Sequence, residues 1–332
     1  MSVDIDWIEP HPHGIYIKPA DAWIDSSKPV SKALVTHGHA DHARGGHGQV
    51  WATPETLAIM ELRYGQAIGH AVPYGGEIEI GGVKISFHSA GHVLGSAQIL
   101  MEYQGNKVVA TGDYKRRADP TCAPFEIIPC DIFITEATFG LPVFKHPDTA
   151  TEIAKLLQVQ QTHPDRSVLV GAYALGKAQR LIGELRLAGY DEPIFLHGAL
   201  EKMCRLYTKL GIELGELRPV MDSDKDSMKG KIVLAPPSAL NDRWSRRLPK
   251  PITAMASGWM RVRQRARQRN VELPLIMSDH ADWDELTQTI KDVSPKETWI
   301  THGREDALMR WCELNQIKAK ALALVGREEE DD

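Results

Sequence analysis

The sequence predicts an α/β protein of two parts, the first rich in short strands and the second built from alternating helices and strands. Its 332 residues exceed the length at which a single core usually stops growing. Short apolar runs separated by Gly- and Pro-rich turns fill the first part, and helical spacing appears between strands from about Asp148 onward. A dense group of His and Asp residues directly follows one of the early strands. These observations predict two α/β domains with a polar site at the end of a strand.

The first part of the chain contains apolar or alternating runs that are typical of strands. We expect strands within residues 22–25, 32–37, 77–88, 97–103, 106–113 and 131–137. Between them, residues 54–64 have helical spacing, and Thr53 followed by Pro54 is a typical helix start. Because strand ends in an α/β scaffold face solvent, we expect functional side chains there.

From residue 149 to residue 198 the pattern alternates between helix and strand, which predicts a small parallel α/β unit, and further strands and helices follow it. We expect helices within residues 149–161, 176–189, 282–293 and 305–316, and strands within residues 167–173, 192–198, 232–237, 272–280 and 297–303. The polar stretch 221–231 separates two of these elements.

The composition, 42% hydrophobic and 25% charged, is that of an ordinary globular protein. No apolar run is long enough for a signal peptide or a membrane-spanning helix, so we expect a cytoplasmic protein with no membrane partner. The four cysteines contain no CxxC pair, which argues against a disulfide framework and a thiolate zinc site. The net charge of -5 hides an uneven distribution, because residues 242–269 carry nine Lys and Arg against one acid.

Four potential metal ligands lie within six residues after the predicted strand 32–37. They are His37, His39, Asp41 and His42. Imidazole nitrogens and carboxylate oxygens suit borderline divalent metals, and the absence of thiolates favours a catalytic site over a closed structural one. The alternative is a His-rich surface loop with incidental metal affinity.

Three further candidate ligands occupy the same kind of position, at the exit of a strand. His92 lies in a glycine-flanked turn, Asp113 follows the strand 106–113, and His302 lies near the end of the strand 297–303. Each has a simple alternative as a turn residue, a cap or a strand-end histidine. Six closely spaced residues cannot surround two ions, so we expect these three to complete the site.

The order of these residues resembles the metallo-β-lactamase fold, in which two sheets pack between helices in an αββα sandwich. The resemblance implies that His37, His39 and His92 hold a first divalent metal, and that Asp41, His42 and His302 hold a second, with Asp113 bridging them. Zinc is the first choice of metal and manganese the alternative. Asp25 matches an aspartate that supports the ligand loop from behind. A metal pair suits in-line phosphoryl displacement, although lactamases, thioesterases and glyoxalases resemble the same pattern.

Three features beyond the ligands narrow the resemblance to the β-CASP nucleases, in which a cap domain interrupts the catalytic domain. They are Glu136 at a strand end, His280 in the run SDHADW, and the α/β region between them. We expect the metallo-β-lactamase domain at 1–145 and 275–327, the β-CASP cap at 146–274 and an acidic tail at 328–332. His280, oriented by Glu136, would be the general acid that protonates the leaving sugar oxygen. The alternative is an ordinary buried polar pair.

Two basic segments are candidates for binding nucleic acid. The run ALGKAQR resembles a strand–glycine–helix element of the cap, where Lys177 and Arg180 could hold a phosphate, although glycine before a helix also serves packing. The second segment contains Trp259, Arg261, Arg263 and Arg265, with an arginine at every second position. These arginines would line one face of a strand or spread around a helix, and an aromatic ring beside cations suits single-stranded nucleic acid. A solvated charged face is the alternative.

The runs VTHGHADHARGGH, ASGWM and SDHADW resemble the bacterial ligase-associated DNA exonucleases. This resemblance favours DNA over RNA, a single strand or an end as substrate, a role in DNA repair, and a DNA ligase or helicase as partner. An RNA-processing endo- or exoribonuclease of the β-CASP family is the main alternative. A non-catalytic nucleic-acid-binding scaffold is the third.

Overall fold

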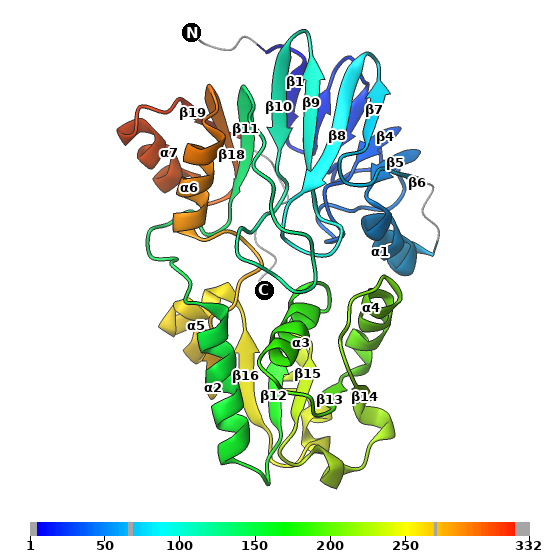
Figure 1. The fold of residues 1–332 in the computed structure, drawn as a ribbon, viewed down its shortest axis with the longest axis vertical. Coiled ribbons are helices and arrows are strands. Elements are labelled where there is room, and N and C mark those ends of the chain that lie inside the picture. The colour runs from blue at the N-terminus through cyan, green and yellow to red at the C-terminus, as the bar shows by residue number, and fades with distance from the viewer. Residues whose placement is uncertain (1–4, 66–68, 269–270, 323–332) are drawn as a thin grey trace. The chain divides into compact units, whose positions relative to one another are not determined.

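The computed structural model describes residues 5–65, 69–268 and 271–322, and the chain divides into two compact units (Figure 1). Unit 1 comprises the described residues of 1–118, 122–145 and 280–331. Unit 2 comprises those of 119–121 and 146–279. The expected acidic tail at 328–332 lies outside the described residues.

The first sheet of unit 1 has six strands in sequence order, antiparallel at its beginning and parallel from β3 onward. Its strands are β1 (Ile8–His11), β2 (Gly14–Ile17), β3 (Ala22–Ile24), β4 (Lys32–Leu34), β5 (Gln49–Ala52) and β6 (Gly69–Ala71). The predicted helix is confirmed as α1 (Pro54–Tyr64). Thr53 begins it by accepting a hydrogen bond from the amide of Thr56, and Gly65 ends it in the left-handed region at φ 80°.

The second sheet of unit 1 has seven strands in the order β19-β18-β11-β10-β9-β8-β7. Its strands are β7 (Glu77–Ile80), β8 (Val83–Ser89), β9 (Ala97–Tyr103), β10 (Asn106–Ala110), β11 (Ile132–Ala137), β18 (Glu297–Gly303) and β19 (Ala319–Ala321). Helices α6 (Trp283–Val293) and α7 (Glu305–Leu314) lie beside this sheet (Figure 1). Strand β18 pairs with β11 although residues 138–296 separate them in the sequence, which brings the strand ends of the N- and C-terminal segments together.

Three apolar clusters define the layers of unit 1. Side chains of both sheets, such as Leu34 of β4 and Ile99 of β9, share one core. The opposite face of the first sheet packs on α1, where Val50 meets Met60. The opposite face of the second sheet packs on α6 and α7, where Phe133 joins the cluster of Leu286 and Leu308. Unit 1 is therefore an αββα sandwich, as the resemblance implies.

Unit 2 is a six-stranded parallel sheet in the order β14-β13-β15-β12-β16-β17 with helices around it. Its strands are β12 (Val168–Gly171), β13 (Ile194–Leu196), β14 (Leu217–Pro219), β15 (Ile232–Ala235), β16 (Ile252–Ala256) and β17 (Leu273–Leu275). Its α-helices are α2 (Thr149–Thr162), α3 (Lys177–Leu187), α4 (Gly198–Lys209) and α5 (Arg263–Gln268). Short 3₁₀ helices are η1 (Val220–Asp222), η2 (Lys225–Met228), η3 (Pro237–Ala239), η4 (Arg243–Arg247) and η5 (Gly258–Arg261). The parallel α/β prediction for this part is confirmed.

The structure corrects one local prediction for unit 2 and decides between two alternatives for another. The strand expected over 272–280 covers only Leu273–Leu275, and the backbone beyond it is irregular. The arginine-rich segment, predicted as either strand or helix, forms η5 and then α5. Its arginines therefore spread around a helical axis and do not share one strand face.

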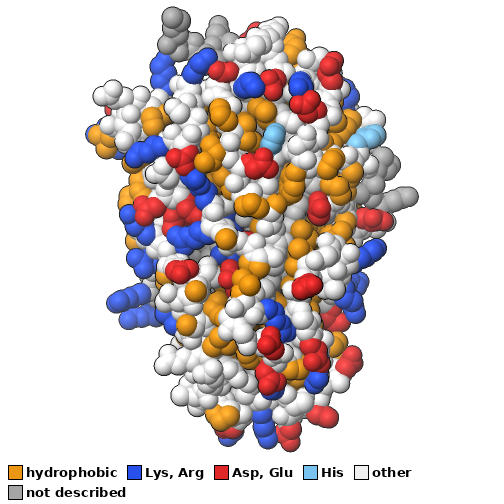
Figure 2. All heavy atoms as spheres, in the orientation of Figure 1, with side chains coloured by type: hydrophobic (Ala, Val, Ile, Leu, Met, Phe, Trp, Pro, Cys, Tyr) orange, Lys and Arg blue, Asp and Glu red, His pale blue; other side chains and the backbone are white. Residues whose placement is uncertain are grey.

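Charge is mixed on the visible surface. Figure 2 shows basic and acidic side chains interspersed with apolar ones on the face that it draws. Among the described residues, no helix has the length and apolar character needed to cross a membrane.

Candidate active site

The turn that follows β4 carries the four closely spaced candidate ligands. The amides of His42 and Ala43 donate to the carbonyl oxygen of His39, at 3.1 and 2.7 Å, and coil the turn. Arg63 of α1 donates to the carbonyl oxygen of Gly38. Backbone hydrogen bonds and α1 therefore shape this turn.

Asp113 lies at the centre of the predicted ligands. Its Oδ2 is 3.4 Å from Nε2 of His37, 3.4 Å from Nε2 of His42 and 3.8 Å from Nε2 of His92. Gly112 precedes it at φ 57°, where a Cβ would lie 2.5 Å from Oγ1 of Thr36. Only glycine lets the end of β10 approach the ligand turn this closely.

His92 completes the first predicted ligand group. Its Nε2 lies 3.0 Å from Nδ1 of His39, so two ring nitrogens face each other across the cluster. His37, His39, His92 and Asp113 each place one ligand atom within 4.8 Å of the others. The structure thus brings together the three histidines and the bridging aspartate expected for one metal.

The second predicted ligand group surrounds His42. Its Nε2 lies 3.3 Å from Oδ2 of Asp41, and its ring centroid is 5.3 Å from that of His302. His302 is an extra residue in the pairing of β18 with β11, since Glu136 pairs with Thr301 and Ala137 with Gly303. At φ 56° it forms a β-bulge that turns its side chain out of the regular alternation. The bulge explains how a strand residue reaches the cluster.

Asp25 supports the ligand turn, as predicted, and it acts on two ligands at once. Its Oδ2 accepts hydrogen bonds from Nδ1 of His42 at 2.7 Å and from Oγ1 of Thr36 at 2.6 Å. Because the Thr36 proton goes to the carboxylate, Nδ1 of His37, 3.0 Å from Oγ1 of Thr36, must donate to that hydroxyl. Both imidazoles are therefore protonated on Nδ1 and present Nε2 to the cluster.

Burial and charge set the protonation of the cluster. Burial, helped by the charge of His42, lowers the pKa of His37 to about 4. Burial also lowers the pKa of His92 well below its usual value. Burial acts against the charged form of His42 too, but the carboxylates of Asp41, Asp113 and Asp25 outweigh it and raise that pKa. For Asp113, burial opposes ionisation while the imidazoles of His42 and His280 more than compensate and lower the pKa.

This donor set fits divalent metal ions. Nε2 of His37 is buried and makes no hydrogen bond within the described residues. The neutral imidazoles of His37 and His92, which face the ionised carboxylate of Asp113, are donors that zinc and similar ions prefer.

Glu136 and His280 form a pair beside the cluster. Nδ1 of His280 lies 3.2 and 3.0 Å from the two carboxylate oxygens of Glu136, which is fully buried. The ring centroid of His280 is 4.7 Å from that of His92. Because a carboxylate only accepts, Nδ1 of His280 carries the proton and Nε2 faces away from Glu136. The sequence-based pairing of these two residues is present in the structure.

Lys177 and Arg180, which the sequence suggested for phosphate binding, form ion pairs inside unit 2. Both side chains are almost fully buried, at 2% and 1% exposure. Lys177 pairs with Asp279 at 3.0 Å, and Arg180 lies 3.2 Å from Asp279 and 3.5 Å from Asp119. These cations satisfy carboxylates inside unit 2 and are not exposed to a ligand.

The arginine-rich segment is only partly available. Trp259 is buried, and the guanidinium of Arg265 lies 4.0 Å from the centroid of its ring. The ring of Trp259, which the sequence suggested for stacking on nucleic acid, is therefore packed inside unit 2 with Arg265 against it. Arg261 and Arg263 are exposed, as a phosphate contact requires.

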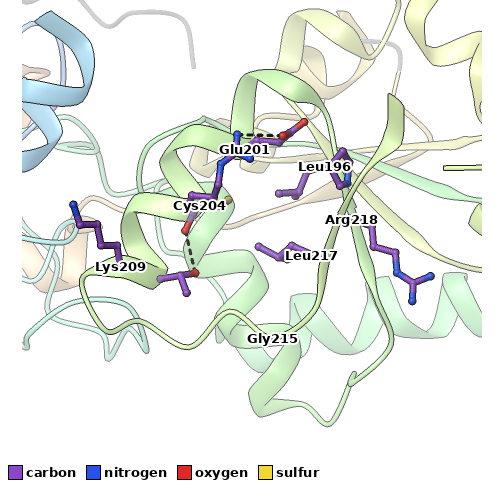
Figure 3. Close-up of a pocket in the computed structure, with 10 residues that line it drawn as sticks. Leu196, Glu201, Cys204, Lys209, Gly215, Leu217 and Arg218 are labelled. Atoms are coloured by element: carbon purple, nitrogen blue, oxygen red, sulfur yellow. Dashed lines mark hydrogen bonds and ion pairs between the residues drawn. The ribbon is translucent and has the colours of Figure 1, made fainter. Parts of the chain in front are cut away.

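Two features escaped the sequence patterns. Thr36 relays between Asp25 and His37, and its position directly before the first ligand was the available signal. Unit 2 also contains a cavity of about 580 Å³ between α4 and β14, shown in Figure 3. Apolar Leu196 and Leu217 line it together with charged residues such as Lys209. None of the predicted site residues lines this cavity.

Comparisons with known proteins agree with the geometry. The sequence model described as the Metallo-beta-lactamase superfamily matches residues 12–171. A crystal structure of a protein of unknown function from Enterococcus faecalis is similar over 92% of this chain and 81% of that chain, with a TM-score of 0.58 at 14% identity. At that identity the likeness supports the fold alone.

Three curated proteins are similar to this chain in sequence. A protein of Opitutus terrae named "Probable DNA ligase" is 30% identical over 329 residues, covering 94% of this chain and 32% of the relative. "Endoribonuclease YSH1" of Eremothecium gossypii is 35% identical over 51% of this chain and 23% of its own length. "Ribonuclease TTHA0252" of Thermus thermophilus is 27% identical over 55% of this chain and 50% of its own length. The chain therefore spans half or less of each of these relatives.

Proposed function

Because the chain belongs to the metallo-β-lactamase superfamily, we propose that it is a metal-dependent nuclease of the β-CASP type that hydrolyses phosphodiester bonds. The observation that carries the proposal is the Glu136–His280 pair beside the ligand cluster. A departing sugar oxygen needs a proton, and an imidazole oriented by a carboxylate is a competent general acid near neutral pH. A hydrolase of small activated esters has no need of such a pair.

The residues of the cluster would hold two divalent ions. His37, His39 and His92 would bind the first ion. Asp41, His42 and His302 would bind the second, with Asp113 shared between them. The ions would supply Lewis acidity toward water and the phosphate oxygens. We propose zinc, with manganese as the alternative.

The remaining roles belong to the protein itself. Asp25 keeps the imidazoles of His42 and His37 in the tautomer that presents Nε2. Glu136 keeps Nδ1 of His280 protonated, so that a proton on Nε2 can move to the leaving sugar oxygen as the P–O bond breaks. Solvent then returns a proton to His280, which restores the acid.

Within this class we propose a DNA exonuclease that acts on a single strand or an end during DNA repair. The relative named "Probable DNA ligase" matches nearly the whole chain, and it supports both a DNA substrate and a DNA ligase as partner. A repair helicase is a further candidate partner by the family resemblance.

A ribonuclease is the second candidate. Two relatives with ribonuclease names match about half of the chain, and the cluster chemistry is the same for either sugar. The third candidate, a non-catalytic binding scaffold, is disfavoured because the four ligands proposed for the first ion lie together with the Glu136–His280 pair beside them.

Unit 2 would bind the substrate strand in this proposal, as a β-CASP cap. Arg261 and Arg263 are its exposed candidates for phosphate contacts. Their contribution would be independent of base sequence, because contacts to phosphate position a strand without reading it.

One assay separates these candidates. End-labelled single-stranded DNA and RNA of the same sequence would be incubated with the metal-free protein after adding zinc or manganese. The proposal predicts shortening of the DNA from one end. Preferred cleavage of RNA would replace DNA by RNA as substrate, and binding of either strand without any cleavage would favour the scaffold.

A further inference from the structure

Two segments of unit 1 carry the groups proposed for hydrolysis, and the backbone of Tyr114 joins them. The amide of Tyr114 donates to Oε1 of Glu136 at 2.7 Å, and its carbonyl oxygen accepts from the amide of Ala281 at 2.6 Å. Tyr114 directly follows Asp113, and Ala281 directly follows His280. The two backbone hydrogen bonds of Tyr114 therefore connect the segment of Asp113 with the segment of His280.

Glu285 of α6 provides a second connection between the same segments. Its Oε1 accepts hydrogen bonds from the amides of Arg116 and Arg117, at 3.1 and 2.8 Å. Its Oε2 accepts from the amide of Asp282 at 3.1 Å and thereby caps its own helix. Helix capping needs only one of these oxygens. The other oxygen, Oε1, binds the backbone of Arg116 and Arg117, which follow Asp113 in the sequence.

A salt bridge completes this connection. Nη2 of Arg117 lies 2.5 Å from Oδ2 of Asp282, whose side chain is 1% exposed. Oδ1 of Asp282 is engaged with the amides of Asp284 and Glu285, so Arg117 binds the oxygen that the helix does not use. We call the set of Arg117, Asp282 and Glu285 the clamp.

We propose that the clamp, through Glu285 and Arg117, positions His280 relative to Asp113 during hydrolysis. This inference rests on the proposed nuclease function. Proton transfer and metal chemistry act on opposite sides of one phosphorus atom, so the two groups must keep a fixed separation. A displacement of about 1 Å can cost roughly 100-fold in rate. The clamp residues act on His280 and Asp113 through the chain segments that carry these two residues.

The test uses two substrates that differ in their need for an acid. Single-stranded DNA releases a sugar alkoxide, which needs the proton from His280, whereas bis(p-nitrophenyl) phosphate releases a stable nitrophenolate, which does not. The variants are Glu285→Gln and Arg117→Gln, with His280→Ala as the reference for a missing acid. Asp292→Asn is the matched control, because it breaks the exposed ion pair of Arg116 with the same helix.

The clamp predicts a selective loss. Glu285→Gln should lower kcat on DNA by roughly 10- to 100-fold at an unchanged KM, and should change the nitrophenyl rate less than about threefold. Arg117→Gln should show the same pattern to a smaller extent, and Asp292→Asn should match the unaltered protein. In the metal-free protein, the His280 imidazole signal in NMR should broaden in Glu285→Gln and stay sharp in Asp292→Asn.

Two results would overturn the clamp. Equal losses on both substrates in Glu285→Gln and Arg117→Gln would mean that the residues only support the fold or the ligand loop. Unchanged DNA cleavage in both variants would mean that His280 needs no such positioning. If the unaltered protein cleaves the nitrophenyl ester but no nucleic acid, the proposed function itself fails and the clamp fails with it.

Discussion

In unit 1 the predicted ligand atoms face one another. In unit 2 most of the side chains predicted to bind phosphate instead contact other side chains of the same unit. Around Asp113, three histidine nitrogens lie within 3.8 Å of one carboxylate oxygen. In unit 2, Lys177 and Arg180 are buried against carboxylates, and Arg265 covers Trp259. Closely spaced His and Asp residues therefore indicate a functional site more reliably than Lys and Arg do, because Lys and Arg also form ion pairs that only stabilise the fold.

The first prediction concerns the centre of unit 1. Asp113→Asn removes the charge that faces three imidazoles, and we expect phosphodiester hydrolysis to fall by roughly a thousandfold. Single-strand binding should survive, since the substitution leaves unit 2 unchanged. The control is Asp131→Asn, which alters an acid paired with Lys296 on the surface of the same unit. Hydrolysis at the original rate in Asp113→Asn would contradict the two-metal site.

The second prediction addresses the buried cations of unit 2. Arg180→Gln leaves Asp119 and Asp279 in a buried environment with one cation fewer, and we expect a loss of about 3 kcal/mol or more in the free energy of unfolding. Chemical denaturation measures this loss. Arg205→Gln, which affects an exposed pair with Glu201, should cost less than about 1 kcal/mol. A fully stable Arg180→Gln protein with weaker DNA binding would instead support a phosphate-binding role for Arg180.

The third prediction isolates the relay of Thr36. Thr36→Val removes the hydroxyl that connects Asp25 to His37, and we expect metal affinity to fall by roughly 10- to 100-fold. Thr36→Ser keeps the hydroxyl and should bind metal nearly as well as the unaltered protein. Metal titration of both variants checks the difference. Equal affinities would show that the relay does not orient His37.

The smallest effect is expected from the exposed arginines of unit 2. Replacing Arg261 and Arg263 by Gln should weaken single-strand binding severalfold and lower the salt dependence by about one unit per lost phosphate contact. The nitrophenyl rate should not change. Arg310→Gln, which removes one exposed positive charge on α7, is the control for each of the two replacements made singly. An unchanged salt dependence would assign the arginines to an ordinary solvated face.

Local patterns predicted the elements with strong boundary signals. The helix 54–64 was marked by Thr53 and Pro54, and the structure has both the side-chain cap and the same bounds. Helix α4 escaped prediction although its apolar residues have helical spacing, because its cap is a histidine and its first residue a glycine. Strand β16 escaped because it lies inside the basic region.

The site was predictable in its ligands and less so in its supports. Their positions at strand ends were sufficient to predict that His92, Asp113 and His302 lie near the ligand turn. The bulge at His302 depends on the register of β18 against β11, which no single segment encodes. The burial of Arg180 likewise depends on carboxylates more than 50 residues away along the chain. The bulge at His302 and the burial of Arg180 could therefore not be predicted from local spacing, because both depend on residues far away in the sequence.

Reconstitution of the metal-free protein tests the central claim most directly. Zinc or manganese would be added in steps while cleavage of end-labelled single-stranded DNA and metal content are measured together. The account predicts no cleavage without metal and full activity at two ions per chain. Cleavage that persists after complete metal removal, or its absence at every metal loading, would contradict a two-metal nuclease.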